Sequence, residues 1–460
     1  MATATPRSID ADPLRAAHRG PVVTAADDGW DMARAAWNLA VDQRPELVAR
    51  AECTEDVVAA VRFAREHALR VRMQGTGHGA CGDLSGALLI DTSAMRGVEI
   101  DAGRRVARVE AGALWSDVAG PAAAHGLAGL AGSSGGVGVV GYTLGGGMGL
   151  LGRRHGFAAN SVEAVELVDA AGELRRVDAE SDPELFWALR GGGGNFGAVI
   201  ALEFRLHPVA EVYAGNLFWP IERAREVMLA YAAWTATVPD TVTSSIRLLR
   251  LPPIPAVPEP LRGGAFINVV AAVIGDAATG AATIAPLREV APAYLDTFCA
   301  MSPDGLVEVA GDPLDPVPSI SGHALLADLP PDAIDAVLEV AGPEAQTPLL
   351  QVEMRQLGGA LGEAAPGSGA VGGLEAGFAL FAVGLPMAPG HAEAIAASLA
   401  GLRSAVGPWT TERRYLNFTD DAVDAATLYP SPAHRRLAEL RARIDPDAVF
   451  QANHEIAGAR

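Results

Sequence analysis

The chain has 460 residues, half of them hydrophobic, and a formal net charge of −20 at pH 7. This length allows two domains or one large core with insertions, and the acidic balance argues against a nucleic acid or an anionic membrane as partner. All 35 basic residues are arginine, so there is no lysine for a pyridoxal-phosphate Schiff base or a Walker-type phosphate loop.

Cysteine usage and hydropathy predict a soluble, cytoplasmic protein. Cys53, Cys81 and Cys299 are too few and too widely spaced for a disulfide framework or a zinc site, so we expect no metal. Residues 1–30 lack the apolar core of a secretory signal. The most apolar later segment, residues 378–387, is too short to span a membrane.

The first hundred residues predict a helix at 30–40, then a second helix with Thr54 as its N-cap. Strands at 69–73 and 87–91 flank the loop 75–79, Gly-Thr-Gly-His-Gly. Glycines at alternate positions let backbone N–H groups turn towards an anion and let a bulky ligand approach the main chain. His78 in this loop is a candidate nucleophile or ligand, and a purely structural histidine is the alternative.

Residues 126–152 form the most glycine-dense region, after a hairpin predicted at 98–109. Residues 136–141 fit the dinucleotide pattern GxGxxG, but no strand precedes them as that fingerprint requires. Residues 132–136 fit the nucleophile-elbow pattern GxSxG around Ser134, again without a leading strand. Both interpretations are disfavoured, which leaves a glycine-built surface for a flat, large ligand.

The segment that follows predicts a hairpin at 161–177 and a short helix starting at Asp182. That helix is followed by a third glycine-rich loop suited to binding an anion, residues 190–197, and then by a strand at 198–206. Beyond residue 210 the pattern changes to alternating strands and helices. The predicted helices there are 221–235, 277–288 and 431–443, and the predicted strands are 242–251, 265–274 and 349–357, the last with Gln351, Glu353 and Arg355 on one polar face.

Five segments in this order resemble the FAD-linked oxidases of the berberine-bridge-enzyme-like branch of the vanillyl-alcohol-oxidase superfamily. They are residues 75–79, 142–156, 185–197, 415–418 and 445–453. The resemblance implies an α+β fold with a discontinuous FAD-binding domain of two subdomains (PCMH type) and a substrate domain whose antiparallel sheet, flanked by helices, covers the isoalloxazine. The implied domains are 1–208 and 412–460 for FAD, and 209–411 for the substrate.

The resemblance also implies FAD held by a single covalent bond. His78 occupies the position that bonds the flavin 8α-methyl group. The family's second, cysteinyl position holds Ser134 here, and a serine cannot form that thioether. Val137 matches a small residue near the oxygen-reactive flavin carbon. The other expected flavin-binding residues are Gly75, Thr76, Gly77, Gly79, Gly138, Gly141, Tyr142, Gly145, Gly146, Gly147, Gly194, Asn195, Val199 and Asn453.

The implied reaction is oxidation of a small-molecule alcohol or amine, in line with the family's secondary-metabolite substrates, with hydride transfer to FAD and reoxidation by O2 to give H2O2. Tyr415 is expected to contact or deprotonate the substrate, and Asn417 to orient substrate or flavin. A phenol needs a cationic neighbour to act as a base near neutral pH. Arg413, expected on the same face of a strand, or Arg355 would supply the charge, and Glu353 is an alternative base.

Two other functions stay open from the sequence. One is a serine hydrolase that uses Ser134. The other is a flavin-bearing protein that sequesters a drug. For the oxidase we expect a small-molecule substrate and O2 as partners, no nucleic acid, no membrane, and a monomer or homodimer.

Overall fold

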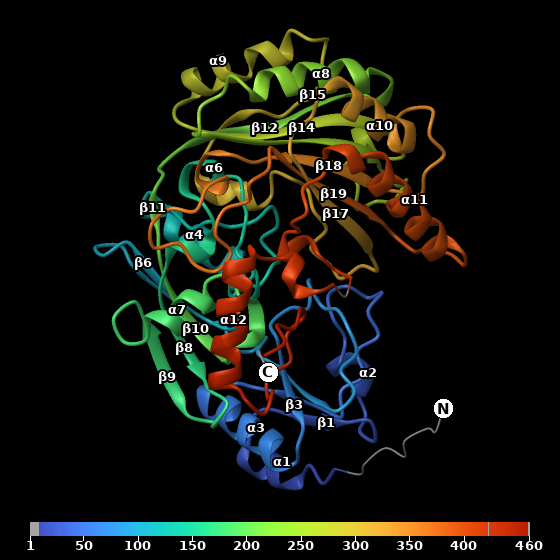
Figure 1. The fold of residues 1–460 in the computed structure, drawn as a ribbon. Coiled ribbons are helices and arrows are strands. Elements are labelled where there is room, and N and C mark those ends of the chain that lie inside the picture. Colours follow the sequence, from blue (N-terminus) through green and yellow to red (C-terminus); the bar gives the residue numbers. More distant parts are fainter. Residues whose placement is uncertain (1–8, 422, 459–460) are drawn as a thin grey trace.

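The computed structural model describes residues 9–421 and 423–458 as a mixed α+β fold built on several β-sheets (Figure 1). Four-, five- and eight-stranded sheets carry most of the strands, and β7 (Leu127–Ala128) pairs with β11 (His207–Pro208) in a small two-stranded sheet. The eight-stranded sheet and its helices occupy the upper half of Figure 1, and the other sheets lie below. The expected fold class is confirmed.

The first sheet has the order β1-β2-β4-β3, in which β4 pairs in parallel with both β2 and β3. Its strands are β1 (Val22–Thr24), β2 (Leu47–Arg50), β3 (Arg70–Gln74) and β4 (Ala87–Asp91). Helix α3 (Thr54–Glu66) links β2 to β3 and buries Val57 and Val61 against the sheet. Helix α3 begins at Thr54 with Cys53 as its N-cap, so it starts one residue earlier than the prediction of Thr54 as N-cap.

The helix predicted at 30–40 is much shorter in the structure, where α2 covers Trp30–Ala33. Tertiary hydrogen bonds explain the difference. The N–H of Trp37 donates to the carbonyl of Thr76 at 3.0 Å, and Asn38 forms a parallel bridge with Val317. This segment therefore joins two distant parts of the chain instead of continuing the helix.

The second sheet is antiparallel, with the order β5-β6-β10-β8-β9. Both predicted hairpins lie in it. Its strands are β5 (Val98–Asp101), β6 (Val106–Glu110), β8 (Val162–Val168), β9 (Leu174–Asp178) and β10 (Ala198–Arg205). Trp115 at the start of α4 (Trp115–Ala123) and Phe204 of β10 belong to the same buried apolar cluster.

The third sheet has the order β15-β12-β14-β13-β18-β19-β17, with β16 paired to β12. Its strands are β12 (Val212–Pro220), β13 (Val242–Arg250), β14 (Ala265–Ile274), β15 (Leu295–Asp296), β16 (Cys299–Met301), β17 (Ile320–Leu326), β18 (Gln351–Gln356) and β19 (Phe378–Gly384). Ile246 and Met354 face the covering helices within one apolar cluster. Side chains alternate along a strand, so Arg247 and Glu353 face the other way.

The helices divide between the two halves of the molecule. Helices α8, α9, α10 and α11 cover the outer face of the eight-stranded sheet, and α12 lies beside the second sheet, where it contacts α7 (Figure 1). Helix bounds not yet given are α1 (Asp12–Ala17), α5 (Val139–Leu144), α6 (Gly152–His155), α7 (Pro183–Leu189), α8 (Ala224–Thr235), α9 (Ala277–Arg288), α10 (Pro331–Ala341), α11 (His391–Ala405) and α12 (Ser431–Ile444).

After α12 the chain returns to the first sheet. Val71 of β3 donates to the carbonyl of Val449 at 2.7 Å, and its own carbonyl accepts from the N–H of Gln451 at 2.8 Å. This return follows the order that the sequence predicted, although the exact domain boundaries stay a prediction. None of the helices in the described residues is long and apolar enough to cross a membrane.

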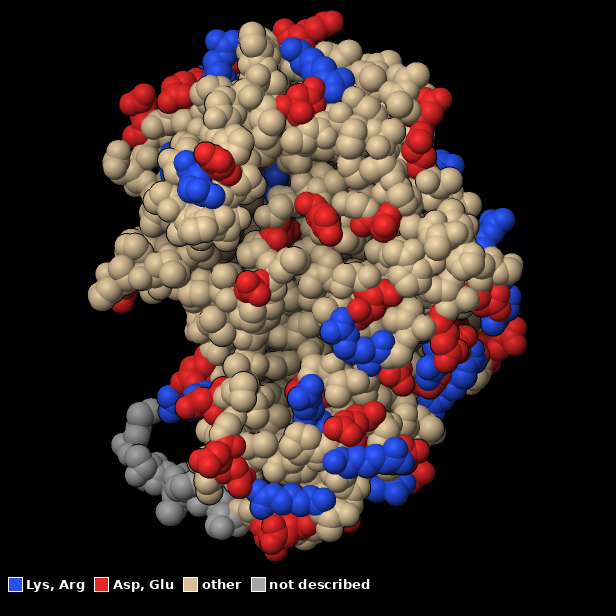
Figure 2. All heavy atoms as spheres, turned by 180° about the vertical axis from the view of Figure 1, so that it is seen from behind, with Lys and Arg blue, Asp and Glu red and all other residues tan. Residues whose placement is uncertain are grey.

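Charge on the surface is dispersed. Figure 2 shows acidic and basic side chains intermingled over the face opposite that of Figure 1. Many arginines pair with acids, as in Arg225–Asp335 at 2.7 Å and Arg176–Glu203 at 3.0 Å.

Candidate active site

A cavity of about 340 Å³ lies where the glycine loops, strand β18 and the C-terminal return meet. This volume is in the range of ligand pockets. Most of the predicted site residues line it. They are Gly75, Thr76, Gly77, His78, Gly79, Val137, Gly138, Gly141, Tyr142, Gly145, Gly194, Asn195, Val199, Arg355, Tyr415, Asn417 and Asn453.

Four predicted residues lie outside the lining: Ser134, Gly146, Gly147 and Glu353. Gly146 and Gly147 have φ values of 120° and 80°, and a Cβ atom on Gly147 would come within 2.5 Å of the Tyr142 ring. Both glycines therefore serve close packing behind the tyrosines of the cavity wall.

Ser134 does not have the surroundings of a hydrolase nucleophile. It is buried, and its Oγ accepts a hydrogen bond from the N–H of Gly136 at 3.3 Å. In the described part of the chain no histidine hydrogen-bonds to it. Gly138 is the N-cap of the six-residue helix α5, which follows a loop and not a strand, so the dinucleotide interpretation fails as well.

His78 is held in the wall of the cavity as a neutral imidazole, because burial lowers its pKa to about 4. Its Nδ1 shares a 2.8 Å hydrogen bond with the Thr76 hydroxyl. Its ring stacks on the indole of Trp37, with ring centroids 4.2 Å apart and planes 17° apart. Gly77 (φ 82°) lets the loop contact Ala36, since a Cβ atom there would lie 2.8 Å from the Ala36 Cα.

Tyr415 and Asn417 form the polar centre of the cavity. Tyr415 is 1% exposed, and its hydroxyl oxygen accepts from Asn417 Nδ2 at 3.3 Å. Burial raises the pKa of Tyr415 above its ordinary value, and the N–H groups of Gly147 and Met148 with the Arg355 charge offset this only in part. The phenol therefore stays protonated at neutral pH and can donate a hydrogen bond.

Arg413 is not the cation beside Tyr415 that the sequence predicted. Tyr415 lies in an irregular segment before a 3₁₀ turn, so the expected strand face does not exist. Arg413 donates instead to the carbonyls of Gly373 at 2.7 Å and Val371 at 3.3 Å. Arg355 supplies the neighbouring charge.

Arg355 belongs to a buried row of charges on the inner face of the large sheet. The Glu353 carboxylate oxygen Oε1 lies 3.1 Å from Nη2 of Arg355. Arg247 on β13 is the cross-strand partner of Glu353. Burial opposes ionisation of Glu353, but the two arginines outweigh it and keep its pKa below the ordinary value. Glu353 is therefore a paired carboxylate that orients Arg355, and not a free base.

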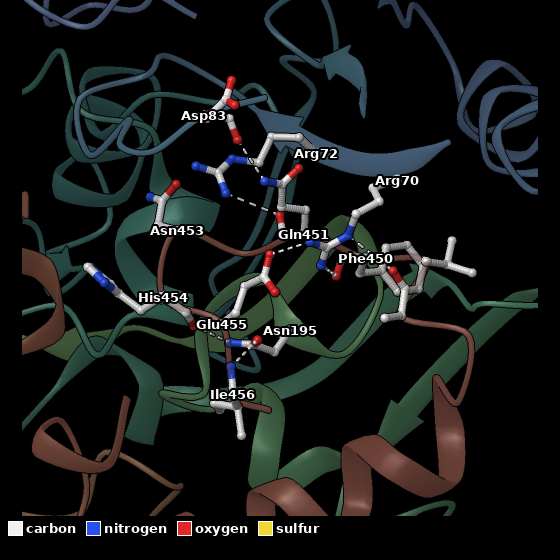
Figure 3. Close-up of polar contacts among 12 residues, drawn as sticks. Arg70, Arg72, Asp83, Asn195, Phe450, Gln451, Asn453, His454, Glu455 and Ile456 are labelled. Carbon is white, nitrogen blue, oxygen red and sulfur yellow. Dashed lines mark hydrogen bonds and ion pairs between the residues drawn. The ribbon is translucent and has the colours of Figure 1, made fainter. Parts of the chain in front are cut away.

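The C-terminal return lines part of the cavity, and Figure 3 shows its polar contacts with Arg72, Asp83 and Asn195. Arg72 donates to the carbonyl of Gln451 at 3.2 Å, and Gln451 donates to the carbonyl of Asp83 at 2.8 Å. Asn195 is fully buried and donates to the carbonyl of His454 at 3.0 Å. Asn195 thus acts mainly by fixing the return segment.

The residues present fit FAD. His454 is 5% exposed and lines the cavity; its Nε2–H donates to the carbonyl of Thr419, so Nδ1 is an acceptor, and it has no partner within the described residues. A buried acceptor of this kind needs a donor, such as a ribityl or ribose hydroxyl. Cβ atoms added to Gly138 and Gly194 would meet nothing closer than 3.6 and 4.0 Å, so these glycines leave room for a cofactor.

Sequence reasoning missed several residues of this site. Trp37 was assigned to a helix, and no local pattern signals its stack on His78. Ser133 lines the cavity and donates to Asp312 at 2.6 Å, across 179 residues of sequence. His454 directly follows a predicted residue, Asn453, and the signal that could have found it is this position in the closing motif.

Three comparisons bear on this site. A family model described as an FAD binding domain matches residues 45–178. An uncharacterised FAD-linked oxidoreductase of Bacillus subtilis, YgaK, is 31% identical over 234 residues, 49% of this chain and 52% of the relative. The crystal structure of 6-hydroxy-D-nicotine oxidase from Arthrobacter nicotinovorans superposes with a TM-score of 0.83 at 25% identity, covering 97% of this chain and 99% of that one.

A berberine-bridge-enzyme-like protein from Physcomitrella patens shares the fold, with a TM-score of 0.83 at 18% identity over 98% of this chain and 99% of that one. In the sequence comparison the chain spans about half the length of the curated relative named above. The resemblance predicted from the five motifs is confirmed.

Proposed function

Because this chain carries the FAD-binding domain and the fold of the FAD-linked oxidases of the berberine-bridge-enzyme-like type, we propose that it oxidises a small-molecule alcohol or amine. The observation that carries the proposal is the cavity where the His78 loop meets Tyr415, Asn417 and Arg355. FAD, when bound, supplies the two-electron acceptor, and O2 regenerates it with release of H2O2.

In this proposal Tyr415 binds the substrate as a hydrogen-bond donor. Its phenol keeps its proton because burial raises its pKa, and Asn417 holds the phenol oxygen. The Tyr415 O–H then points at the alcohol oxygen or amine nitrogen of the substrate and fixes the carbon that loses hydride.

Among the two substrate classes we favour the amine. A neutral amine loses hydride without first giving up a proton, whereas an alcohol needs a base for its O–H. Tyr415 is protonated and Glu353 is paired with Arg355 outside the lining. Asp420 is the carboxylate among the lining residues, and its side chain accepts a hydrogen bond from Ser321; oxidation of an alcohol would need such a group as base.

We further propose one covalent bond between His78 and FAD. A neutral imidazole is the nucleophilic form, and burial keeps His78 neutral at pH 7. Ser134 cannot provide a thioether and lies outside the cavity lining.

The test begins with the visible spectrum of the purified protein and its precipitation with acid. A yellow pellet in the wild type that becomes colourless in H78A supports the covalent bond. H2O2 release is then screened with amines and alcohols, and Y415F is expected to lose turnover while it keeps its flavin. A colourless protein that FAD does not reconstitute would overturn the proposed function. A yellow protein that turns over no amine or alcohol would favour a sequestering role.

A further inference from the structure

We propose that Ser133 and Asp312 form a proton relay that takes the ammonium proton from an amine substrate before hydride transfer. Ser133 is the member of the relay that touches the substrate, and Asp312 is the proton acceptor that acts through it. The inference rests on the proposed oxidation of an amine. It adds the form in which the substrate enters the site, which is the ammonium ion.

An amine substrate needs such an acceptor because it is charged in solution. An aliphatic amine has a pKa of about 10, as the lysine side chain does, so roughly one molecule in a thousand is neutral at pH 7. The ammonium form has no lone pair to stabilise the carbon that loses hydride. A group in the site that removes this proton therefore makes the abundant form of the substrate reactive.

Ser133 has the contacts that a relay requires. It lines the cavity, and its hydroxyl donates to Asp312 Oδ2 at 2.6 Å. A hydroxyl donates one hydrogen bond and has two lone pairs that accept. Within the part of the chain that the structure describes, no protein group donates to the Ser133 oxygen, so its lone pairs are open to a donor in the cavity. An ammonium N–H is such a donor.

The backbone on both sides of Asp312 is held in place. Arg247 donates to the carbonyl of Ala310 at 2.9 Å. The indole Nε1–H of Trp37 donates to the carbonyl of Leu314 at 3.3 Å. Asp312 lies midway between these two anchored residues, so its carboxylate is kept beside the cavity wall. Such fixed geometry is what a proton transfer through a hydroxyl requires.

The surroundings suit Asp312 to accept a proton. Burial raises its pKa above the ordinary value, whereas the Ser133 hydrogen bond and two arginines, Arg247 and Arg355, oppose this rise. The charge of Glu353 adds to the rise. A carboxylate with a raised pKa is a stronger base, closer to the pH at which the enzyme works. Asp312 also keeps some exposed surface, through which it returns the proton to solvent after each turnover.

The relay moves one proton and no electrons. The substrate N–H bond breaks as its proton passes to Ser133 Oγ, and the Ser133 O–H bond breaks as its proton passes to Asp312 Oδ2. The serine ends with the hydroxyl it began with, and the carboxylate becomes a carboxylic acid. The neutral amine then loses hydride to FAD and becomes an iminium ion, and O2 takes the two electrons as in the proposed function.

The experiment measures flavin reduction by stopped flow without O2, over a range of pH, in the flavin-loaded wild type, S133A, S133T, D312N and D420N. The probe is whichever of N-methylbenzylamine, N-methylpyrrolidine and benzylamine gives the fastest H2O2 release with the wild type. S85A is the matched control, because it removes an exposed hydrogen bond from Ser85 to Asp83 at 2.8 Å, outside the cavity lining. Flavin content and thermal melting report the folding of each variant, and S133A with S133T decides the test if D312N does not hold flavin.

We expect S133A and D312N to lower the second-order rate constant of flavin reduction about 100-fold at pH 7, the size of a general-base contribution. The loss is expected to shrink as the pH rises and to be about threefold or less near pH 10, where much of the amine is already neutral in solution. S133T keeps the hydroxyl and is expected near the wild-type rate, as is S85A. A structural defect alone would lower the rate by the same factor at every pH.

The outcomes that overturn the inference differ from those that overturn the function. A loss in S133A and D312N that is equal at pH 7 and pH 10, or unchanged rates in both, would refute the relay while the oxidase activity stood. A pH-dependent loss in D420N but not in D312N would give the proton to Asp420 instead. A wild type that oxidises alcohols and none of the three amines would also refute the relay alone. A protein without flavin, or one inert with both classes, would overturn the proposed function itself.

Discussion

Replacing Glu353 with glutamine is expected to destabilise the protein, because its carboxylate pairs with Arg355 and lies opposite Arg247 in a buried row of charges on the large sheet. The Arg355 and Glu353 side chains are 12% and 6% exposed, and their closest N–O distance is 3.1 Å. Arg247 keeps neutral partners, Asn268 Oδ1 at 2.7 Å and the carbonyl of Ala310 at 2.9 Å. Within residues 9–421 and 423–458, Arg355 has one other hydrogen bond, to the Met148 carbonyl at 3.3 Å.

The magnitude follows from this difference between the two arginines. Removing one partner of a buried ion pair costs about 3–5 kcal/mol, because the other charge stays buried without compensation. The glutamine oxygen still accepts one hydrogen bond from Arg355, so we expect E353Q at the lower end, about 3 kcal/mol. The double variant E353Q/R355M removes the stranded charge and is expected to recover most of this loss.

The assay is urea unfolding of the apoprotein, followed by fluorescence. A matched control is D335N, which breaks the exposed pair Arg225–Asp335, with side chains 57% and 45% exposed. Exposed pairs of this kind contribute about 0–1 kcal/mol. If E353Q unfolds at the same urea concentration as D335N, or if E353Q/R355M is less stable than E353Q, the interpretation of Glu353 as the compensating charge is wrong.

Three further outcomes are expected. Y415F is expected to lower kcat/KM about 100-fold at unchanged flavin content, because it removes one donor to the reacting group; an equal loss of flavin would refute this. G147A is expected to cost about 2 kcal/mol or more in thermal unfolding, since its Cβ would lie 2.5 Å from the Tyr142 ring at a φ of 80°. His78 and His323 have pKa values lowered by burial to about 4 and about 3. The unfolded chain binds more protons below about pH 6.5, so the thermal midpoint should fall as pH drops from there towards about 4; a constant midpoint would contradict it.

Local patterns predicted much of the fold. The hairpins of the second sheet and the helix Ala277–Arg288 need only sequence neighbours, and the structure has them where the pattern indicated. The motif resemblance predicted most of the cavity lining. The misses have a common physical cause, which is competition from distant partners. Trp37 leaves the predicted helix to bind Thr76, and Tyr415 has no strand to share with Arg413 because its N–H bonds to His323 at 2.9 Å.

The glycine and charge motifs also do not distinguish residues that line the cavity from residues that pack behind its wall. Gly146 and Gly147 belong to the same run as Gly145, yet only Gly145 lines the cavity. Glu353 and Arg355 lie on the same face of strand β18, but of these two side chains the arginine lines the cavity and the glutamate does not. These distinctions depend on packing across the sheet, which the sequence pattern does not contain.

The return of the chain to β3 also sets an order of events during synthesis on the ribosome. Phe450 pairs with Val71, and Gln451 and His454 complete a cavity begun by residues 71–79. Until residues 450–454 emerge, the first glycine loop lacks this wall of the cavity. FAD is therefore expected to bind in full only once residues 450–454 have joined β3.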